Sequence, residues 1–194
     1  MRMTEPVDLV PAGQRMARLV EGVPEGAIGW PTPCHEYTVG DLLDHIGGAA
    51  LAFIAAAVKE PLDPAPAGDA ANLGLDWRSR IPRDLLALGE AWRQPDAWTG
   101  VTAAGGVELP GGVAGLVALD ELLIHGWDLA VATGQPAGYE GPGLEAVSTT
   151  VQHFRSAGIE GLFGPEVPQA GDAPLMDRIL GLAGRDPGWQ PPDR

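Results

Sequence analysis

Residues 112–134, GVAGLVALDELLIHGWDLAVATG, are the stretch that decides the fold, because they predict the longest and best-delimited helix of the chain. Apolar residues recur along it at helical spacing and form one stripe. The leucines of that stripe are Leu116, Leu119, Leu123 and Leu129. Gly134, followed by Pro136, is typical of a helix end. The pattern favours a helical bundle, in which such a stripe packs against other helices.

The same predicted helix carries two residues with metal-ligand chemistry. Glu121 and His125 are four residues apart, and four residues turn an α-helix by about 400°, so both side chains project from one face. This spacing suits two ligands of one small cation. Asp128 follows three residues after His125, close to the same direction. From spacing alone, a solvent-exposed Glu–His pair remains an open alternative.

A second helix has a clear predicted start. Thr38 lies three residues before Asp41, which is a capping-box pattern, and DLLDHIGGAALAFIAAAV continues the helix to about Lys59. His45 falls on the apolar face of this helix. The other residues of that face are Leu42, Ile46, Ala49 and Phe53. His45 is therefore expected to point into the bundle, either as a hydrogen-bonded core histidine or as a ligand.

The remaining segments predict shorter elements around these two helices. They are a helix capped by Asp8 and ending near Val23-Pro24, a connecting loop over 61–75, a helix from about Pro82 to Trp92, a small hairpin within Trp98–Pro110, a helix over about Pro142–Gly158 and a last helix over Leu175–Leu182. No internal repeat or βαβ alternation is visible. We therefore expect an all-α protein, a four-helix bundle with peripheral short helices and a small hairpin. Residues 1–194 are expected to form a single domain, with 160–194 as a short C-terminal appendage.

Composition narrows the class of protein. The chain of 194 residues has 26 Asp and Glu against 12 Lys and Arg, a formal net charge of -14. This charge disfavours nucleic-acid and anionic membrane partners. The single cysteine, Cys34, excludes an intramolecular disulfide, and the N-terminus lacks the apolar core of a signal peptide. The longest apolar stretch, Ile46–Val58, is short for a membrane span, so a cytoplasmic protein is expected.

The combination of His45, Glu121 and His125 predicts a metal site. An ionised Glu on the inward side of a bundle is costly unless something compensates its charge, and a cation does so. Two histidines and one carboxylate suit zinc with an open fourth position, and they equally suit ferrous iron or nickel. Cys34, in a proline-bounded loop before the second helix, is expected to be a buried or half-buried thiol rather than a nucleophile. His153 is expected at the surface or the edge of the core.

Two segments also resemble a known family. PTPCHEYTVGDLLDHIGG (31–48) and ALDELLIHGWDLAVATGQP (118–136) resemble the DinB-like metal-binding helical superfamily. More closely, they resemble the metal-binding domain of mycothiol-dependent maleylpyruvate isomerase. The ending LMDRILGLAGRDPGW (175–189) resembles the tail of a stand-alone branch of that family. The resemblance implies that the residues at His45, Glu121 and His125 bind a divalent cation, with Asp128 as a neighbour that orients a ligand.

The resemblance also implies a function. It points to a mycothiol-dependent transferase or isomerase, in which a low-molecular-weight thiol attacks an electrophilic substrate. The isomerase has a further C-terminal domain that contributes to substrate binding, and this chain ends without it. The resemblance therefore supports the metal site in this chain better than it supports the maleylpyruvate reaction. Two alternatives stay open: a metal-dependent hydrolase with Asp128 as general base, and a non-catalytic metal-binding bundle. The sequence also leaves open whether the protein forms a homodimer.

Overall fold

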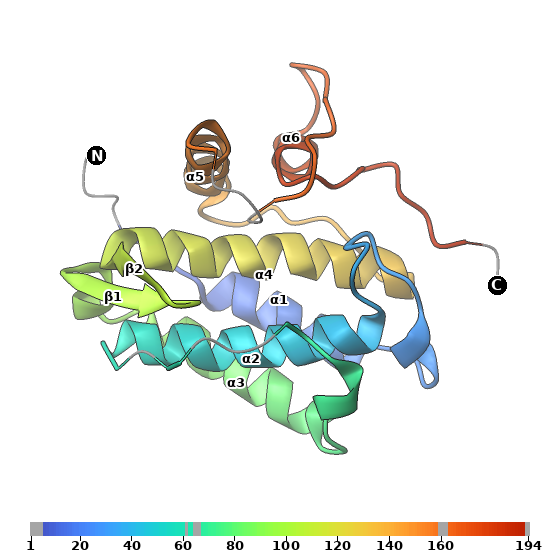
Figure 1. Ribbon diagram of the computed structural model, residues 1–194, viewed down its shortest axis with the longest axis horizontal. Helices are drawn as coiled ribbons and strands as arrows, with labels where there is room; N and C mark the ends of the chain where they lie inside the picture. Colours follow the sequence, from blue (N-terminus) through green and yellow to red (C-terminus); the bar gives the residue numbers. More distant parts are fainter. Residues whose placement is uncertain (1–5, 61, 64–66, 159–162, 193–194) are drawn as a thin grey trace.

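The core of the molecule is a bundle of four helices, as the sequence predicts. The computed structural model describes residues 6–60, 62–63, 67–158 and 163–192. The bundle comprises α1 (Val10–Glu21), α2 (Val39–Ala57), α3 (Trp77–Ala91) and α4 (Gly111–Thr133). α1 and α2 each pack against both α3 and α4, so α1 and α2 occupy opposite corners of the bundle (Figure 1). The leucine stripe predicted on α4 is buried in this arrangement.

Two smaller units flank the bundle. Strands β1 (Val101–Ala104) and β2 (Val107–Pro110) form the predicted antiparallel hairpin. Gly105 and Gly106 connect them with φ values of 58° and 78°, as a type I′ turn requires. Helices α5 (Leu144–Ser156) and α6 (Leu175–Leu182) pack against each other, and α5 packs on α4 (Figure 1). α4 is therefore covered on two sides, by the bundle and by the C-terminal helices.

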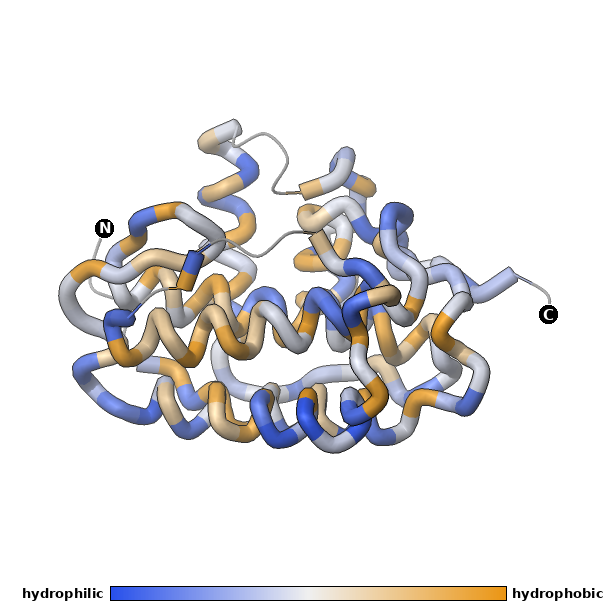
Figure 2. The backbone as a smooth tube through the Cα atoms, turned by 60° about the horizontal axis from the view of Figure 1, so that its bottom comes forward, coloured by the Kyte–Doolittle hydropathy of each residue, from blue (hydrophilic) through white to orange (hydrophobic). Residues whose placement is uncertain are grey.

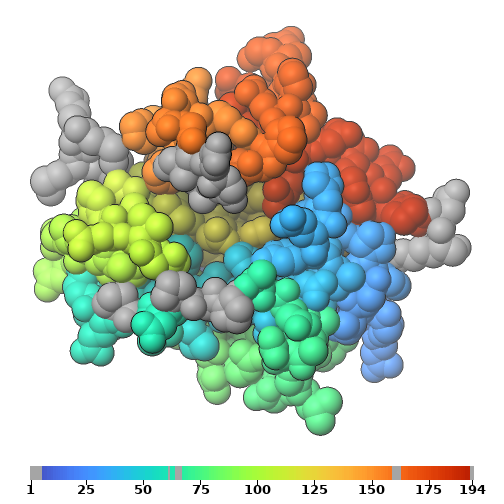
Figure 3. Space-filling view, in the orientation of Figure 1, coloured from blue at the N-terminus to red at the C-terminus, as the bar shows by residue number. Residues whose placement is uncertain are grey.

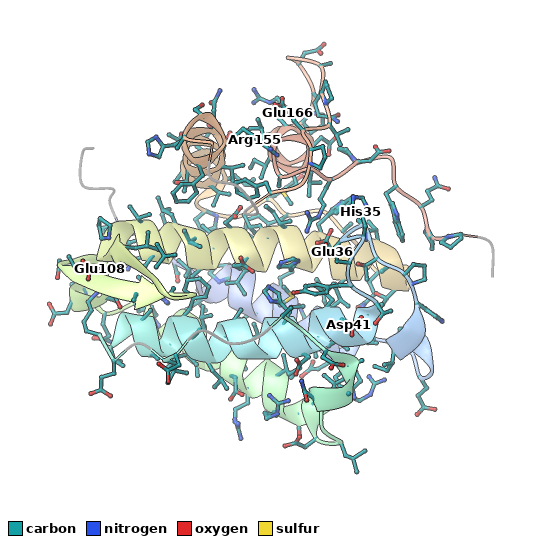
Figure 4. All side chains as sticks on the ribbon, in the orientation of Figure 1. His35, Glu36, Asp41, Glu108, Arg155 and Glu166 are labelled. Carbon is teal, nitrogen blue, oxygen red and sulfur yellow. The ribbon has the colours of Figure 1, made fainter. Side chains whose placement is uncertain are left out.

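Three 3₁₀ turns complete the described elements: η1 (Ala27–Gly29), η2 (Ala70–Asn72) and η3 (Pro95–Trp98). Arg155 of α5 links α5 to the C-terminal segment, because its guanidinium donates to the carbonyl oxygens of Leu182 and Gly164 (Figure 4). Parts of two predicted regions, residues 61 and 64–66 of the loop and residues 160–162 and 193–194 of the appendage, lie outside the described residues.

The start of α2 confirms the predicted capping box. The Thr38 hydroxyl oxygen accepts the Asp41 N–H at 3.3 Å, and the Asp41 carboxylate accepts the Thr38 N–H at 2.9 Å. The other Asp41 oxygen accepts the Ala70 N–H at 2.8 Å, which ties η2 to the same helix end. Figure 4 shows Asp41 near the first turn of α2. This cap fixes where α2 begins and hence which face presents His45.

Two predicted helix starts were wrong by different amounts. α1 begins at Val10 with Leu9 as its N-cap, although the Asp8 carboxylate still accepts the Val10 N–H at 3.0 Å. α3 begins at Trp77, five residues before the predicted start at Pro82. Pro82 lies in the second turn, where it removes one helical N–H donor. Its ring is buried among core residues, and this packing keeps the helix intact across it.

α2 is longer than the apolar stretch Ile46–Val58 that the sequence singled out. The whole helix has 19 residues, and among the described helices it alone is long and apolar enough, by length and composition, to cross a membrane. Half of it is buried inside the protein, between α3 and α4. Figure 2 shows hydrophobic and hydrophilic residues interleaved along the helices of the bundle. In this fold α2 is a core helix of the bundle.

Candidate metal centre

The structure brings His45, Glu121 and His125 together, although 76 residues separate the first two. His45 Nε2 lies 3.1 Å from Glu121 Oε2, and His125 Nε2 lies 3.4 Å from the same oxygen. One ligand atom from each residue lies within 4.8 Å of the others. The imidazole rings are 4.8 Å apart, centroid to centroid, in an edge-to-face arrangement. The two histidines therefore approach one carboxylate oxygen from α2 and from α4.

The three side chains are partly open to solvent. The exposed fractions are 27% for His45, 29% for Glu121 and 13% for His125. Burial raises the pKa of Glu121, but the His45 hydrogen bond and the charges of His125, His45 and Arg185 outweigh it and lower that pKa to about 2. Burial lowers the pKa of His45, and the Glu121 hydrogen bond and charge raise it overall. The centre thus holds an ionised carboxylate between two imidazoles.

His125 is held from its other side by Asp128. The Asp128 Oδ2 atom lies 3.0 Å from His125 Nδ1, and the Asp128 side chain is fully buried. A carboxylate at this distance favours a proton on Nδ1, which leaves the Nε2 lone pair for a cation. Asp128 therefore lies beside His125, and its role in orienting that ligand stays a prediction.

Arg185 completes this arrangement, and sequence reasoning missed it. Its Nε atom lies 3.1 Å and 3.3 Å from the two Asp128 oxygens, and its Nη2 atom lies 3.1 Å from Oδ2. Nη1 donates to the Ala183 carbonyl at 3.2 Å, and the Arg185 side chain is only 12% exposed. Arg185 follows α6, within the segment LMDRILGLAGRDPGW that carried the resemblance. A single arginine after a helix end does not indicate, from the sequence, which carboxylate it will contact.

Cys34 lies close to the same centre. Its thiol, His125 and Asp128 offer three further ligand atoms within 4.8 Å of one another. Both Asp128 oxygens already accept hydrogen bonds from Arg185, so this second group has fewer free lone pairs than the first. Burial raises the pKa of the half-buried Cys34 thiol, and Asp128 adds to that effect while Arg185 opposes it. Cys34 is therefore a half-buried thiol, as expected, rather than an activated thiolate.

The loop before α2 forms one border of the centre. It carries His35 and Glu36, which Figure 4 shows in front of α4. The Tyr37 ring packs against the His45 ring with a centroid distance of 5.5 Å, and its hydroxyl accepts the Gly68 N–H at 3.2 Å. Figure 3 shows α4 at the floor of a hollow between this loop, the hairpin and the C-terminal segment. The centre thus lies where the bundle and the C-terminal segment meet.

Asp120 is the second residue that sequence reasoning missed. It is 8% exposed, and its Oδ1 atom is the one fully buried side-chain oxygen without a hydrogen-bond partner among the described residues. Burial and the neighbouring charge of Glu121 raise the pKa of Asp120 well above its ordinary value. The side chain lines a pocket that adjoins the metal centre. That pocket is lined by Asp120, Glu121, Ile124, His125, Phe163, Ala183 and Arg185.

Known proteins resemble this chain over much of its length. A family model described as the mycothiol maleylpyruvate isomerase N-terminal domain matches residues 9–130, which include every residue of the centre on α2 and α4. Two uncharacterised proteins, one from each of two strains of Mycobacterium tuberculosis, are 26% identical over 180 residues, which cover 90% of this chain and 93% of each relative. No solved structure matches the chain. The chain therefore belongs to the mycothiol maleylpyruvate isomerase N-terminal domain family.

Proposed function

We propose that the protein binds a divalent cation through His45, Glu121 and His125 and acts as a mycothiol-dependent transferase or isomerase. The observation that carries the proposal is the convergence of these three ligand atoms within 4.8 Å. Zinc is the cation we expect first, with nickel and ferrous iron as alternatives for the same donors. Family membership supports the thiol as the co-substrate.

The donor set fits a cation on chemical grounds. Two imidazole nitrogens and one ionised carboxylate oxygen are a common set of three protein ligands for a metal that keeps a position open. The partial exposure of all three side chains is consistent with such a position. When bound there, the cation would lower the pKa of a coordinated thiol and so favour the thiolate at neutral pH.

The residues of the chain have separate parts in this proposal. Asp128 holds the Nδ1 proton of His125 and directs Nε2 toward the centre. Tyr37 packs on His45 and limits its rotation. Neither residue is proposed to react with substrate. The co-substrate would be a low-molecular-weight thiol and the substrate a small electrophile. A cytoplasmic location, where such thiols are kept reduced, is part of the proposal.

The two alternatives receive less support. The hydrolase needs a general base, and Asp128, its predicted base, is fully buried and bound by Arg185. The non-catalytic bundle predicts a closed site in which the protein supplies every ligand. The partial exposure of all three proposed ligands fits that alternative poorly. We therefore place the thiol-dependent enzyme first.

Metal content tests the site. We expect purified wild-type protein to hold about one equivalent of a divalent metal by elemental analysis. His125→Ala should lose it, whereas His153→Ala, an exposed histidine of α5, should retain it. Full occupancy in His125→Ala would refute the site.

Thiol turnover tests the reaction. Metal-loaded wild-type protein is incubated with mycothiol and either maleylpyruvate or a simple electrophile, and isomer or conjugate is quantified. His125→Ala should form no more product than buffer alone. A fully loaded wild-type protein that forms none with any electrophile would favour the non-catalytic bundle.

A further inference from the structure

The pocket beside Asp120 combines a polar and an apolar wall. Asp120 is one of its lining residues, and the buried Oδ1 atom of Asp120 has no hydrogen-bond partner among the described residues. Ile124 and Phe163 supply apolar surface, from α4 and from the segment that precedes α6. Its volume of about 40 Å³ is small, and it borders the two metal ligands of α4. A buried oxygen that lacks a partner is costly, which suggests that a ligand supplies the missing donor.

The charges around the pocket restrict that ligand. The ionised Glu121 disfavours an anion, while the guanidinium of Arg185 disfavours a positive group. Each nitrogen of Arg185 already bonds within the described part of the chain, but a guanidinium has five N–H groups and so keeps donors to spare. The walls therefore offer both an acceptor and a donor. A neutral group that can donate and accept, such as a hydroxyl or an amide, complements them.

We propose that this pocket binds the neutral hydroxyl- or amide-bearing part of an organic ligand, with Asp120 accepting its hydrogen bond. The inference rests on the proposed function in one respect: the ligand is taken to be the thiol whose sulfur reaches the metal. Phe163 and Ile124 pack against the carbon atoms next to the polar group. Asp120 is thus a specificity residue that distinguishes a polar thiol from an alkyl thiol of equal length.

Two neutral thiols of equal chain length test this specificity. N-acetylcysteamine carries an amide, and n-pentanethiol does not. Their affinities for zinc-loaded protein are measured by calorimetry for wild type, Asp120→Ala and Asp120→Asn. Asp120→Ala should weaken N-acetylcysteamine binding about 10-fold and leave n-pentanethiol binding unchanged. Asp120→Asn retains an acceptor oxygen and should restore most of the affinity.

Two controls separate this effect from damage to the centre. Metal content must equal wild type in both variants, and Glu108→Ala, which removes an exposed carboxylate on the hairpin, should change neither affinity (Figure 4). Asp120→Asn should unfold at the same or a higher temperature than wild type, because Asp120 Oδ1 has no hydrogen-bond partner in the part of the chain that the structure describes. A lower unfolding temperature would indicate a structural role and overturn the proposal. The proposal would also be overturned if Asp120→Ala weakened the binding of both thiols equally, or did not weaken N-acetylcysteamine binding selectively.

A metal-free experiment keeps this proposal distinct from the proposed function. If neither thiol binds zinc-treated wild-type protein, the metal-dependent function fails, and the pocket is tested alone. N-ethylacetamide, which has the amide but no sulfur, is titrated into metal-free protein and followed by protein NMR. Shifts confined to α4 and Phe163 in wild type, absent in Asp120→Ala, support the pocket. Identical spectra with and without the amide would refute it.

Discussion

Two acidic side chains of α4, Glu121 and Asp128, lie about two turns apart and meet different parts of the molecule. Glu121 accepts from His45 of α2, so its partners come from the bundle. Asp128 accepts from Arg185, so its strongest partner comes from the C-terminal segment. Between them, His125 faces Glu121 with Nε2 and Asp128 with Nδ1.

This difference in partners suggests different roles for the two carboxylates. On the bundle side the carboxylate is 29% exposed, so its lone pairs are open to a ligand. On the C-terminal side the carboxylate is fully buried, and a guanidinium occupies its oxygens. The first arrangement suits the ligand role proposed for Glu121, whereas the second holds the His125 imidazole and the C-terminal segment. The predictions below test these separate roles, from the largest expected effect to the smallest.

Removal of Arg185 should have the largest effect on stability. Arg185→Leu leaves the Asp128 charge buried without its main partner, and loss of one member of such a pair costs about 3–5 kcal/mol. Urea unfolding of metal-free protein measures this loss. The double variant Arg185→Leu/Asp128→Leu removes both charges and should recover most of it. A loss of unfolding free energy below about 1 kcal/mol, as is typical of exposed ion pairs, would show that this contact does not hold the C-terminal segment in place.

Glu121 should make stability depend on acid. Its folded-state pKa of about 2 lies below the ordinary value of 4.5, so its contribution is fully present above pH 4.5 and is lost as the pH falls through about 2. The shift corresponds to about 3 kcal/mol. In metal-free protein, the difference in unfolding free energy between wild type and Glu121→Gln should shrink over this range. A difference that stays constant with pH would show that Glu121 gains no such stabilisation.

Asp128→Asn should weaken metal binding without abolishing it. The amide occupies the same volume but lacks the negative charge that favours a proton on His125 Nδ1. Loss of such an orienting partner typically lowers metal affinity about 10–100-fold. Competition with a chelator measures the affinity, and Asp177→Asn on α6 is the matched control. An unchanged affinity would mean that Asp128 serves only to attach the C-terminal segment.

Loss of the α2 cap should have the smallest effect. Thr38→Ala removes the hydroxyl that accepts the Asp41 N–H and should cost about 1 kcal/mol of unfolding free energy. Thr149→Ala removes an exposed hydroxyl within α5 and should cost less. If Thr38→Ala also lowered metal affinity as much as Asp128→Asn does, His45 would depend on the cap for its position more than its packing against Tyr37 implies.

The sequence by itself determined most of the helices and one side of the proposed metal centre. Periodicity and caps are local, so α2, α4 and α6 could be placed from neighbouring residues alone. The pair Glu121 and His125 followed from helix geometry for the same reason. The predicted start of α3 was five residues too late, because a proline such as Pro82 usually interrupts a helix. Burial of the Pro82 ring in the core outweighs this local preference, and that burial is a tertiary effect.

Only the tertiary structure decided which residues complete the centre. Spacing along α4 suggested Asp128 as a neighbour, but its partner Arg185 lies 57 residues away, and no local pattern couples the two. Asp120 and Glu121 are adjacent acidic residues, yet Asp120 Oδ1 has no hydrogen-bond partner among the described residues, whereas Glu121 contacts two histidines. The physical reason is that the pKa and the partners of a carboxylate depend on burial and on side chains brought by other elements, which local sequence does not encode.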